Sequence, residues 1–195
     1  MFEIRIHGRG GQGVVTAAEL LSVAAFQDGR HAQAFPSFGS ERTGAPVVSF
    51  CRIDDRAIRV RQPILIPDAL IIIDPTLLHQ VDVFGGLRAD GYVLINSSRD
   101  LDELRLTALL ARTNTARIRT VAATEIARQH LGRPLPNVAL LGSFAALTGA
   151  VTLGSVINAV RERFSGELAD RNVQAATEAF ARLHRPAGVL EPSHA

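Results

Sequence analysis

The sequence lacks the residues on which several common kinds of functional site depend. Its single cysteine, Cys51, can form neither an intrachain disulfide nor, alone, a metal or iron–sulfur site. It contains no tryptophan, only one tyrosine and no basic tail, so it offers none of the aromatic or basic platforms that bind nucleic acid. The histidines show no metal-ligand spacing such as His-x-x-x-His. We therefore expect neither a metal site nor nucleic-acid binding, and any electron-transfer centre must belong to another chain.

Long apolar runs are also missing. The longest, such as residues 69–73, are far shorter than the ~20 residues that cross a bilayer, and the N-terminus carries no signal-peptide pattern. We expect a soluble, cytoplasmic protein that does not enter a membrane. With 195 residues, 47% of them hydrophobic and 21% charged, the chain suits one domain with a substantial core. We assign this domain to residues 1–184 and an arm or disordered tail to the Pro- and Gly-containing residues 185–195.

Lysine is absent as well, because all 21 basic residues are arginines. The planar, permanently charged guanidinium group suits phosphates, carboxylates and interfaces. A genome-wide codon bias toward arginine explains the same composition equally well.

The first quarter of the chain alternates strand and helix patterns around a glycine cluster. Apolar residues alternate with period two over residues 2–7, and the cluster Gly8-Arg-Gly-Gly-Gln-Gly13 follows at once. Apolar residues then recur at three- and four-residue steps over residues 14–27, which predicts an amphipathic helix. A short strand over residues 31–35 completes a β-α-β unit, and residues 36–46 form an ordered loop.

The remaining sequence predicts a buried sheet followed by helices. Residues 46–52 and 57–61 flank Asp54-Asp55 as a hairpin antiparallel to the rest of the sheet. Unbroken apolar runs predict parallel strands over residues 69–73, 92–95 and 116–122, with helices between them over residues 76–84 and 100–111. Only helices follow, over residues 124–131, 137–148, 153–164 and 167–184. The fold class is α/β, with a mostly parallel Rossmann-like sheet, flanking helices, a small antiparallel hairpin and a helical C-terminal third.

The glycine cluster matches the dinucleotide-binding pattern Gly8-x-Gly10-x-x-Gly13 between a strand and a helix. That pattern also needs an acidic residue at the end of the second strand, and residues 31–35 contain none, whereas Asp28 comes too early. A nicotinamide site is therefore disfavoured, although an NADP site that uses Arg30 is kept as an alternative. What remains is an anion-binding loop to which Gln12 adds an amide, or glycines that only allow a helix to pack close to the sheet.

Two further polar segments should reach the same edge of the sheet. Residues 35–46 follow the second strand, so Ser37, Ser40 and Arg42 could approach a phosphate held by the glycine loop. The alternative is a rigid connection in which Glu41 and Arg42 form an ion pair. Asn96, after a buried strand, either contacts a ligand or caps the helix near residue 100.

Two other residues are read as structural. Asp74 is more consistent with a strand stop and helix cap than with a catalytic acid, and Cys51 with packing rather than a nucleophile. The chain thus carries binding chemistry without an obvious reaction centre.

Several motifs together resemble one known family. They are Arg9-Gly-Gly-Gln-Gly13, Pro36-Ser-Phe-Gly-Ser-Glu-Arg-Thr-Gly-Ala-Pro46, Pro67-Asp68 leading into Ile71-Ile-Ile-Asp74, and Gly91-Tyr-Val-Leu-Ile-Asn96. Over about residues 4–184 the sequence resembles the gamma subunit, or gamma domain, of 2-oxoacid oxidoreductases of the pyruvate:ferredoxin oxidoreductase superfamily. The two loops in this order and spacing are specific, whereas the glycine run alone is not.

The resemblance implies a subunit of an enzyme that converts a 2-oxoacid and coenzyme A (CoA) to an acyl-CoA and carbon dioxide. Electrons would pass to ferredoxin or, through a partner flavoprotein, to NAD. Thiamine diphosphate, Mg²⁺ and iron–sulfur clusters would lie on partners: an alpha (pyrimidine-type) subunit, a beta (thiamine diphosphate-binding) subunit and a ferredoxin-like subunit. This chain would have no catalytic residue and no activity alone, but would help to bind CoA. The implied contacts are Gly10, Gly11, Gln12, Gly13, Ser37, Phe38, Arg42 and Asn96.

One position departs from the family pattern. Thr43 stands where many relatives have a second arginine, so the chain either binds CoA less tightly or uses another arginine such as Arg61. Two other functions are kept as alternatives: a free-standing NADP-binding reductase and a purely structural assembly subunit. The resemblance leaves the 2-oxoacid open among pyruvate, 2-oxoglutarate, branched-chain and aromatic substrates.

Overall fold

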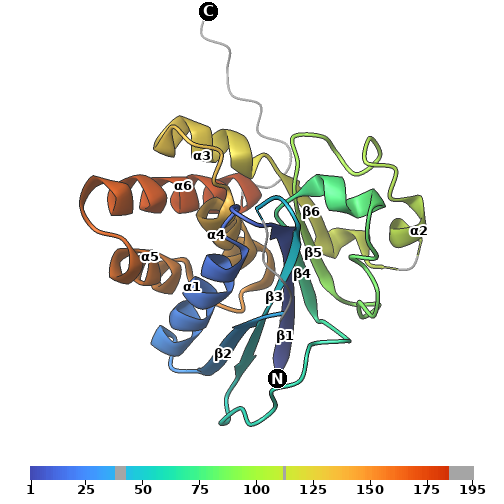
Figure 1. Cartoon of the computed structure of the whole chain (residues 1–195), viewed down its shortest axis with the longest axis horizontal. Coiled ribbons are helices and arrows are strands. Elements are labelled where there is room, and N and C mark those ends of the chain that lie inside the picture. The colour runs from blue at the N-terminus through green and yellow to red at the C-terminus, as the bar shows by residue number, and fades with distance from the viewer. Residues whose placement is uncertain (38–42, 112, 185–195) are drawn as a thin grey trace, which may run out of the picture.

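The computed structural model describes residues 1–37, 43–111 and 113–184, and this part of the chain contains a six-stranded sheet (Figure 1). The strand order is β2-β3-β1-β4-β5-β6. Parallel pairs join β1 to β4, β4 to β5 and β5 to β6, whereas β3 is antiparallel to both β1 and β2. The mostly parallel α/β sheet is therefore confirmed. The strands are β1 (Phe2–Arg9), β2 (His31–Pro36), β3 (Pro46–Asp54), β4 (Ala69–Ile72), β5 (Tyr92–Asn96) and β6 (Ile118–Val121).

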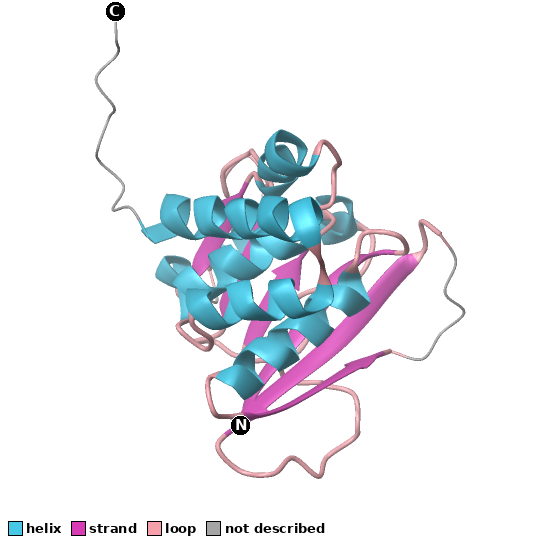
Figure 2. Cartoon of the chain, turned by 90° about the vertical axis from the view of Figure 1, so that its left-hand side faces the viewer, coloured by secondary structure: helices cyan, strands magenta, loops and turns pink. Residues whose placement is uncertain are grey.

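The longer helices gather on one side of the sheet (Figures 1 and 2). Ile4 and Ile6 of β1 belong to the same core cluster as the buried alanines and leucines of the first helix. At Gly142 a Cβ atom would lie 2.0 Å from the carbonyl oxygen of Ala176, so the α4 and α6 backbones are in close contact there. The helices are α1 (Val14–Gln27), α3 (Ala123–Leu131), α4 (Asn137–Thr148), α5 (Leu153–Arg163) and α6 (Gly166–His184).

The opposite face of β4 and β5 is covered by loops and short helical turns. Leu70, Ile72, Val93 and Ile95 form a second apolar cluster there with buried leucines from the connecting segments. The connecting turns are η1 (Pro75–His79), α2 (Thr107–Leu110) and η2 (Thr115–Arg117).

The four C-terminal helices and α1 confirm the sequence predictions to within one residue, but three other predictions are wrong. Residues 57–61 form no strand, because β3 pairs with β1 and β2 instead of with the segment that follows it. Residues 76–84 contain only the short turn η1, and residues 100–111 contain only the single turn α2. β3 also separates β2 from β1, so the first β-α-β unit does not join neighbouring strands.

Two predictions about the chain as a whole are not tested in full. The tail predicted over residues 185–195 lies outside the described residues. Within the described ranges, no helix combines the length and apolar character needed to cross a membrane.

A candidate anion-binding groove at the glycine loop

The glycine loop joins the carboxyl end of β1 to α1 in a conformation that favours glycine. Gly11 and Gly13 have φ values of 93° and 75°, in the left-handed region that side chains disfavour. At Gly13 a Cβ atom would also lie 2.4 Å from Nδ2 of Asn137, the first residue of α4. Gly13 is therefore required both for its backbone angle and for the close approach of α4 to the loop.

The start of α1 leaves backbone N–H groups available to a ligand. Its N-cap residue is Gly13, which offers no side chain, and the first turn contains no acidic residue. The first main-chain bond of the helix runs from the N–H of Ala17 to the carbonyl oxygen of Gly13, so the N–H groups before it have no partner within the helix. The N–H groups of Gly11 and Gly13 donate no hydrogen bond to any residue that the structure describes. Such a helix end, with its partial positive charge, favours anions.

A network of polar side chains supports the glycine loop. The Oε1 atom of Gln12 accepts from the N–H of Arg9 at 2.8 Å, and its Nε2 atom donates to Oδ2 of Asp74 at 2.7 Å. Both ends of this amide are thus occupied, so Gln12, one of the predicted ligand contacts, shapes the loop in this structure.

Arg9 and Asp74 form the centre of that network. The Arg9 guanidinium group contacts Oδ2 of Asp74 at 3.2 Å and donates to Thr76, Gln80 and the carbonyl oxygen of Gly44. Burial opposes ionisation of Asp74, but hydrogen bonds from Thr76 and Gln12 outweigh it and hold the pKa of the carboxyl group below its usual value. Asp74 also caps η1 through the N–H of Thr76. Its prediction as a stop and cap is confirmed.

The loop after β2 reaches the glycine loop, as predicted. The N–H of Gly10 donates to Ala45 at 3.0 Å, and the N–H of Gly44 donates back to Gly10 at 3.1 Å. Ser37 is exposed at the end of β2, with its N–H bonded to Val48. The predicted contacts Phe38, Ser40 and Arg42 lie outside the described residues, so the structure tests none of them.

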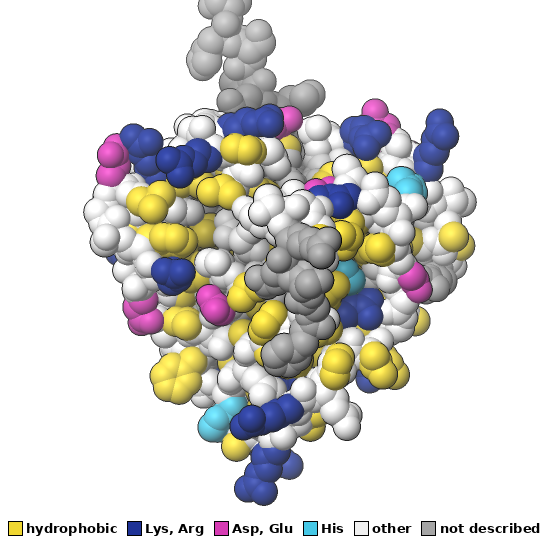
Figure 3. Space-filling model, in the orientation of Figure 1, with side chains coloured by type: hydrophobic (Ala, Val, Ile, Leu, Met, Phe, Trp, Pro, Cys, Tyr) yellow, Lys and Arg dark blue, Asp and Glu magenta, His cyan; other side chains and the backbone are white. Residues whose placement is uncertain are grey.

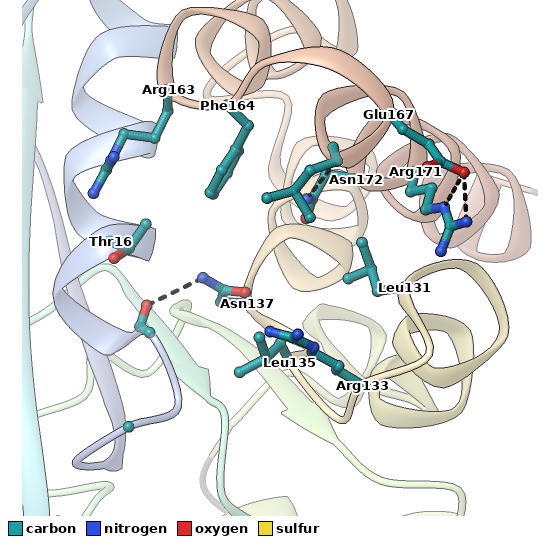
Figure 4. Close-up of a pocket in the computed structure, with 13 residues that line it drawn as sticks. Thr16, Leu131, Arg133, Leu135, Asn137, Arg163, Phe164, Glu167, Arg171 and Asn172 are labelled. Atoms are coloured by element: carbon teal, nitrogen blue, oxygen red, sulfur yellow. Dashed lines mark hydrogen bonds and ion pairs between the residues drawn. The ribbon is translucent and has the colours of Figure 1, made fainter.

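A pocket of about 490 Å³ opens beside the glycine loop, between it and the C-terminal helices (Figure 4). This volume is within the range of roughly 300–1,000 Å³ that small-molecule sites occupy. A second hollow of about 240 Å³ lies against Arg9, Gly10 and Val47. Gly11, Gly13 and Thr16 line both. The two hollows therefore adjoin at these three residues, and we call them together the groove.

Three arginines make the larger pocket basic. Figure 4 shows Arg133, Arg163 and Arg171 on three sides of it, from the α3–α4 connection and from the last two helices. Arg171 is paired with Glu167 at 2.5 Å, and the Arg163 guanidinium group lies 5.8 Å from the centre of the Phe164 ring. Arg133 has no side-chain partner among the residues that the structure describes. With three cations against one carboxylate, the pocket attracts anions.

Two buried amides complete the pocket walls. Asn137 and Asn172 are 7% and 4% exposed, and each uses its Nδ2 atom on a main-chain carbonyl group, that of Gly13 at 3.4 Å and that of Leu168 at 2.8 Å. Figure 4 shows the Asn137 oxygen turned away from Gly13, toward the pocket. Sequence reasoning missed these walls. The available signal was Asn137 itself, an amide at the start of a helix that is mostly apolar.

Asn96 lies elsewhere and is fully engaged. Its Nδ2 atom donates to Ile73 and to Oγ1 of Thr124, both at 2.8 Å, and its Oδ1 atom accepts from the N–H of Thr124 at 3.1 Å. It therefore caps α3 rather than the segment near residue 100. It lines a different hollow, which shares no residue with the groove.

Two arginines that the sequence suggested for phosphate contacts are also placed elsewhere. Arg61 belongs to the β3–β4 connection, at the opposite end of the sheet, so it cannot replace an arginine at position 43. Arg30 is paired with Asp55 at 2.9 Å.

The surroundings of β2 also disfavour a nicotinamide cofactor. Asp28 accepts bonds from Thr152 and Ser155 at the start of α5, so it is not free for a ribose. Because β3 lies between β1 and β2, the end of β2 is two strand spacings from β1 instead of one. The glycine pattern therefore lacks the neighbouring strand and the acidic residue that would bind the ribose of a dinucleotide.

Comparisons with known proteins match almost the whole described chain to one protein family. The profile of the family "Pyruvate ferredoxin/flavodoxin oxidoreductase" matches residues 3–182. The chain is 48% identical to pyruvate synthase subunit PorC of Methanothermobacter marburgensis over 183 residues, covering 94% of this chain and 98% of that one. It is 49% identical to the pyruvate/ketoisovalerate oxidoreductases common subunit gamma of Thermococcus kodakarensis over 180 residues, covering 92% and 96%.

A solved structure agrees. The crystal structure of pyruvate oxidoreductase subunit PORC from Thermotoga maritima superposes with a TM-score of 0.78 at 35% identity and covers 92% of this chain and 95% of that one.

Proposed function

The chain belongs to the pyruvate ferredoxin/flavodoxin oxidoreductase family, as the gamma subunit of a multisubunit oxidoreductase, and from this premise we propose that its groove binds CoA. The observation that carries the proposal is that the two hollows adjoin at Gly11, Gly13 and Thr16. Free backbone N–H groups at the glycine loop adjoin a pocket with three arginines.

The two parts of the groove suit the two parts of CoA. One end of CoA is a nucleotide that carries a pyrophosphate and a 3′-phosphate, and the other is a long uncharged arm that ends in a thiol. The phosphates fit the pocket with Arg133, Arg163 and Arg171, because guanidinium groups form charge-assisted bonds with phosphate oxygens. The arm fits the smaller hollow beside Arg9 and Val47, and the pyrophosphate that joins the arm to the nucleotide fits the free N–H groups of Gly11 and Gly13, which line both hollows.

In this proposal the chain positions CoA and does not carry out the bond-breaking step. Holding the thiol close to the acyl group raises its effective concentration. Thiamine diphosphate, when bound by a partner subunit, supplies the carbanion chemistry of decarboxylation. Within the described residues, no group of three or more His, Cys, Asp or Glu side chains could hold a metal ion. Cys51 is buried, which raises the pKa of its thiol to about 12 and keeps it unreactive.

The rest of the assembly follows from family membership as part of the same proposal. Alpha, beta and ferredoxin-like subunits carry thiamine diphosphate, Mg²⁺ and the iron–sulfur clusters, and the complex works in the cytoplasm. Ferredoxin is the proposed acceptor, with NAD reduction through a flavoprotein as the alternative. Pyruvate is the first substrate to assay and a branched-chain 2-oxoacid the second, because the relatives are named for pyruvate and ketoisovalerate.

The test compares two arginines of α5 that lie two residues apart. Arg163 lines the groove, whereas Arg161 lines a separate hollow with Gln27 and Asn158. In the anaerobically purified complex, Arg163→Ala should raise the KM for CoA about five- to tenfold, the equivalent of roughly 1–1.4 kcal/mol, because one charge-assisted contact is lost. Arg161→Ala should leave that KM within about twofold, and both variants should keep the KM for the 2-oxoacid.

Equal effects of the two substitutions on the KM for CoA would remove the groove from the CoA site. The structural-subunit alternative predicts that neither substitution changes CoA kinetics. The NADP-reductase alternative predicts saturable binding of NADPH to the isolated chain.

A further inference from the structure

A second surface lies at the end of the sheet opposite to the glycine loop. The connection between β3 and β4 runs there, because β3 ends where the parallel strands begin (Figures 1 and 2). It places Val60, Leu65 and Ile66 in solvent, with 43%, 75% and 59% of their surfaces exposed. Single exposed apolar residues are common on protein surfaces, but three large aliphatic side chains exposed on one connection are not.

The connection is firmly held, so the exposure of these side chains is built into the fold. Arg52 of β3 is only 2% exposed, and its guanidinium group donates to the carbonyl oxygens of Gln62 at 2.6 Å and Val60 at 3.4 Å. The same group pairs with Glu3 at 2.8 Å. The backbone that carries the exposed residues is thus fixed to the sheet by a buried charge network.

Neighbouring residues of the connection point inward. Ile64 is 2% exposed and Pro67 is buried, on either side of the exposed pair Leu65 and Ile66. The carbonyl group of Leu65 abuts Gly86, where a Cβ atom would lie 2.0 Å from its oxygen. Because both flanks are packed, Leu65 and Ile66 cannot turn into the core without dismantling this packing.

The same connection carries excess positive charge. Arg56, Arg59 and Arg61 are exposed, and their guanidinium groups have neither an ion pair nor a hydrogen bond within the described ranges. Asp55, at its start, is already paired with Arg30. Figure 3 shows basic and hydrophobic side chains together at this lower end of the molecule. We call the surface formed by Arg56, Arg59, Arg61, Val60, Leu65 and Ile66 the basal face.

We propose that the basal face docks another subunit of the oxidoreductase complex, through an apolar recess on that subunit that is rimmed by carboxylates. The aliphatic side chains would fill the recess and the arginines would meet the acidic rim, the arrangement found in stable protein interfaces. A second copy of this chain fits poorly, because the six residues of the basal face include no carboxylate to meet the arginines of the copy. Docking at this end leaves the groove at the other end open.

The first test is a site-specific photo-crosslink in the complex itself. A benzophenone side chain at Leu65 should crosslink to a different subunit, at a peptide that contains Asp or Glu, when the anaerobically purified complex is irradiated. The matched control is a benzophenone at Phe26, another hydrophobic residue, 72% exposed, on α1. That control should crosslink at least fivefold less. Crosslinks from position 65 only to a second copy, only to co-purified lipid, or to nothing would overturn the proposal.

The second test uses charge. Leu65→Asp combined with Ile66→Asp should lower recovery of the partner subunits with the tagged chain at least tenfold, as measured by quantitative mass spectrometry of each subunit, whereas Phe26→Asp should leave recovery unchanged. Because all three side chains are exposed, the melting temperatures of the purified chains should stay within about 2 °C of the parent. Normal recovery with the double variant would refute the docking role.

Failure of this proposal is distinguishable from failure of the proposed function. The docking proposal rests on membership of the multisubunit family and not on CoA binding. Groove variants should change the KM for CoA in a complex of normal subunit content, whereas basal-face variants should change subunit content and leave the KM for CoA of the remaining complex unaltered.

Discussion

Substituting alanine at the two left-handed glycines of the loop separates backbone strain from steric contact. At Gly11, with φ of 93°, a Cβ atom would meet nothing within 4 Å, so Gly11→Ala costs only the strain, about 1 kcal/mol. At Gly13, with φ of 75°, the Cβ atom would lie 2.4 Å from Nδ2 and 3.0 Å from Cγ of Asn137. Asn137 is 7% exposed and starts a buried helix, so it cannot move aside freely. Gly13→Ala should therefore cost about 3 kcal/mol in all.

Thermal denaturation of the purified chain measures the difference. At about 2–4 °C per kcal/mol for a chain of this size, Gly11→Ala should lower the melting temperature by about 2–4 °C and Gly13→Ala by about 6–12 °C. Gly13→Ala should lower the melting temperature less in the Asn137→Ala background than in the parent, because the shorter side chain at position 137 removes the clash. Equal shifts for the two glycine variants, or no coupling with Asn137, would refute the claim that α4 closes against the loop.

Three further predictions concern the buried polar residues His7, Asp74 and Arg52. Burial and, secondarily, the nearby Arg5 guanidinium group lower the pKa of His7 to about 4; the unfolded chain therefore binds a proton between pH 6.5 and 4 that the folded chain does not. The free energy of unfolding should fall by about 3 kcal/mol as the pH drops through this window, and urea titrations should show His7→Gln losing most of that dependence.

The pKa of Asp74 lies below its usual value of 3.8, so the carboxylate stabilises the fold fully above about pH 4 and loses this contribution as the pH falls through its folded pKa. Asp74→Asn should lower the free energy of unfolding by about 1–2 kcal/mol at pH 7. An unchanged urea midpoint at that pH would contradict the role of Asp74 in the network. Arg52→Ala should cost about 3 kcal/mol and speed tryptic cleavage in the β3–β4 connection, whereas unchanged cleavage would show that Arg52 does not hold it.

Local pattern predicted the elements that carry a clear period or an unbroken apolar run of their own. Helix α1 matches its predicted bounds because its apolar periodicity is bounded by Gly13 and by Asp28-Gly29. The buried parallel strands were equally visible as unbroken apolar runs. The partners of β3 were not, because β3 pairs with β2, which precedes it, and with β1 at the start of the chain, instead of with the segment that follows it.

The two failed helix predictions have a common cause. Leu104 and Leu106 are both buried, although residues two apart lie about 200° apart around a helix and cannot share one face. The chain resolves this by placing Arg105 at φ of 54°, which ends any helix there. In residues 76–84, the carbonyl group of Val83 accepts from the Arg5 guanidinium group, as does that of Gly85 just beyond. Tertiary contacts that no local pattern encodes thus replaced the helix.

The candidate site divides in the same way. The glycine loop and its contact with residues 43–45 follow from motif order and sheet topology. Arg133, Asn137 and Arg163 are more than a hundred residues away and reach the loop only because α4 and α5 pack against α1. For Asn96 the structure supports the capping alternative, with α3 as the capped helix, and its predicted contact with CoA stays a prediction.

The most direct test of the central claim is a structure of the anaerobically purified complex with CoA bound, determined by cryo-electron microscopy. The account predicts the nucleotide phosphates beside Arg133, Arg163 and Arg171, with the arm of CoA crossing Gly11 toward Val47. CoA bound entirely by other subunits, with this groove empty, would contradict it.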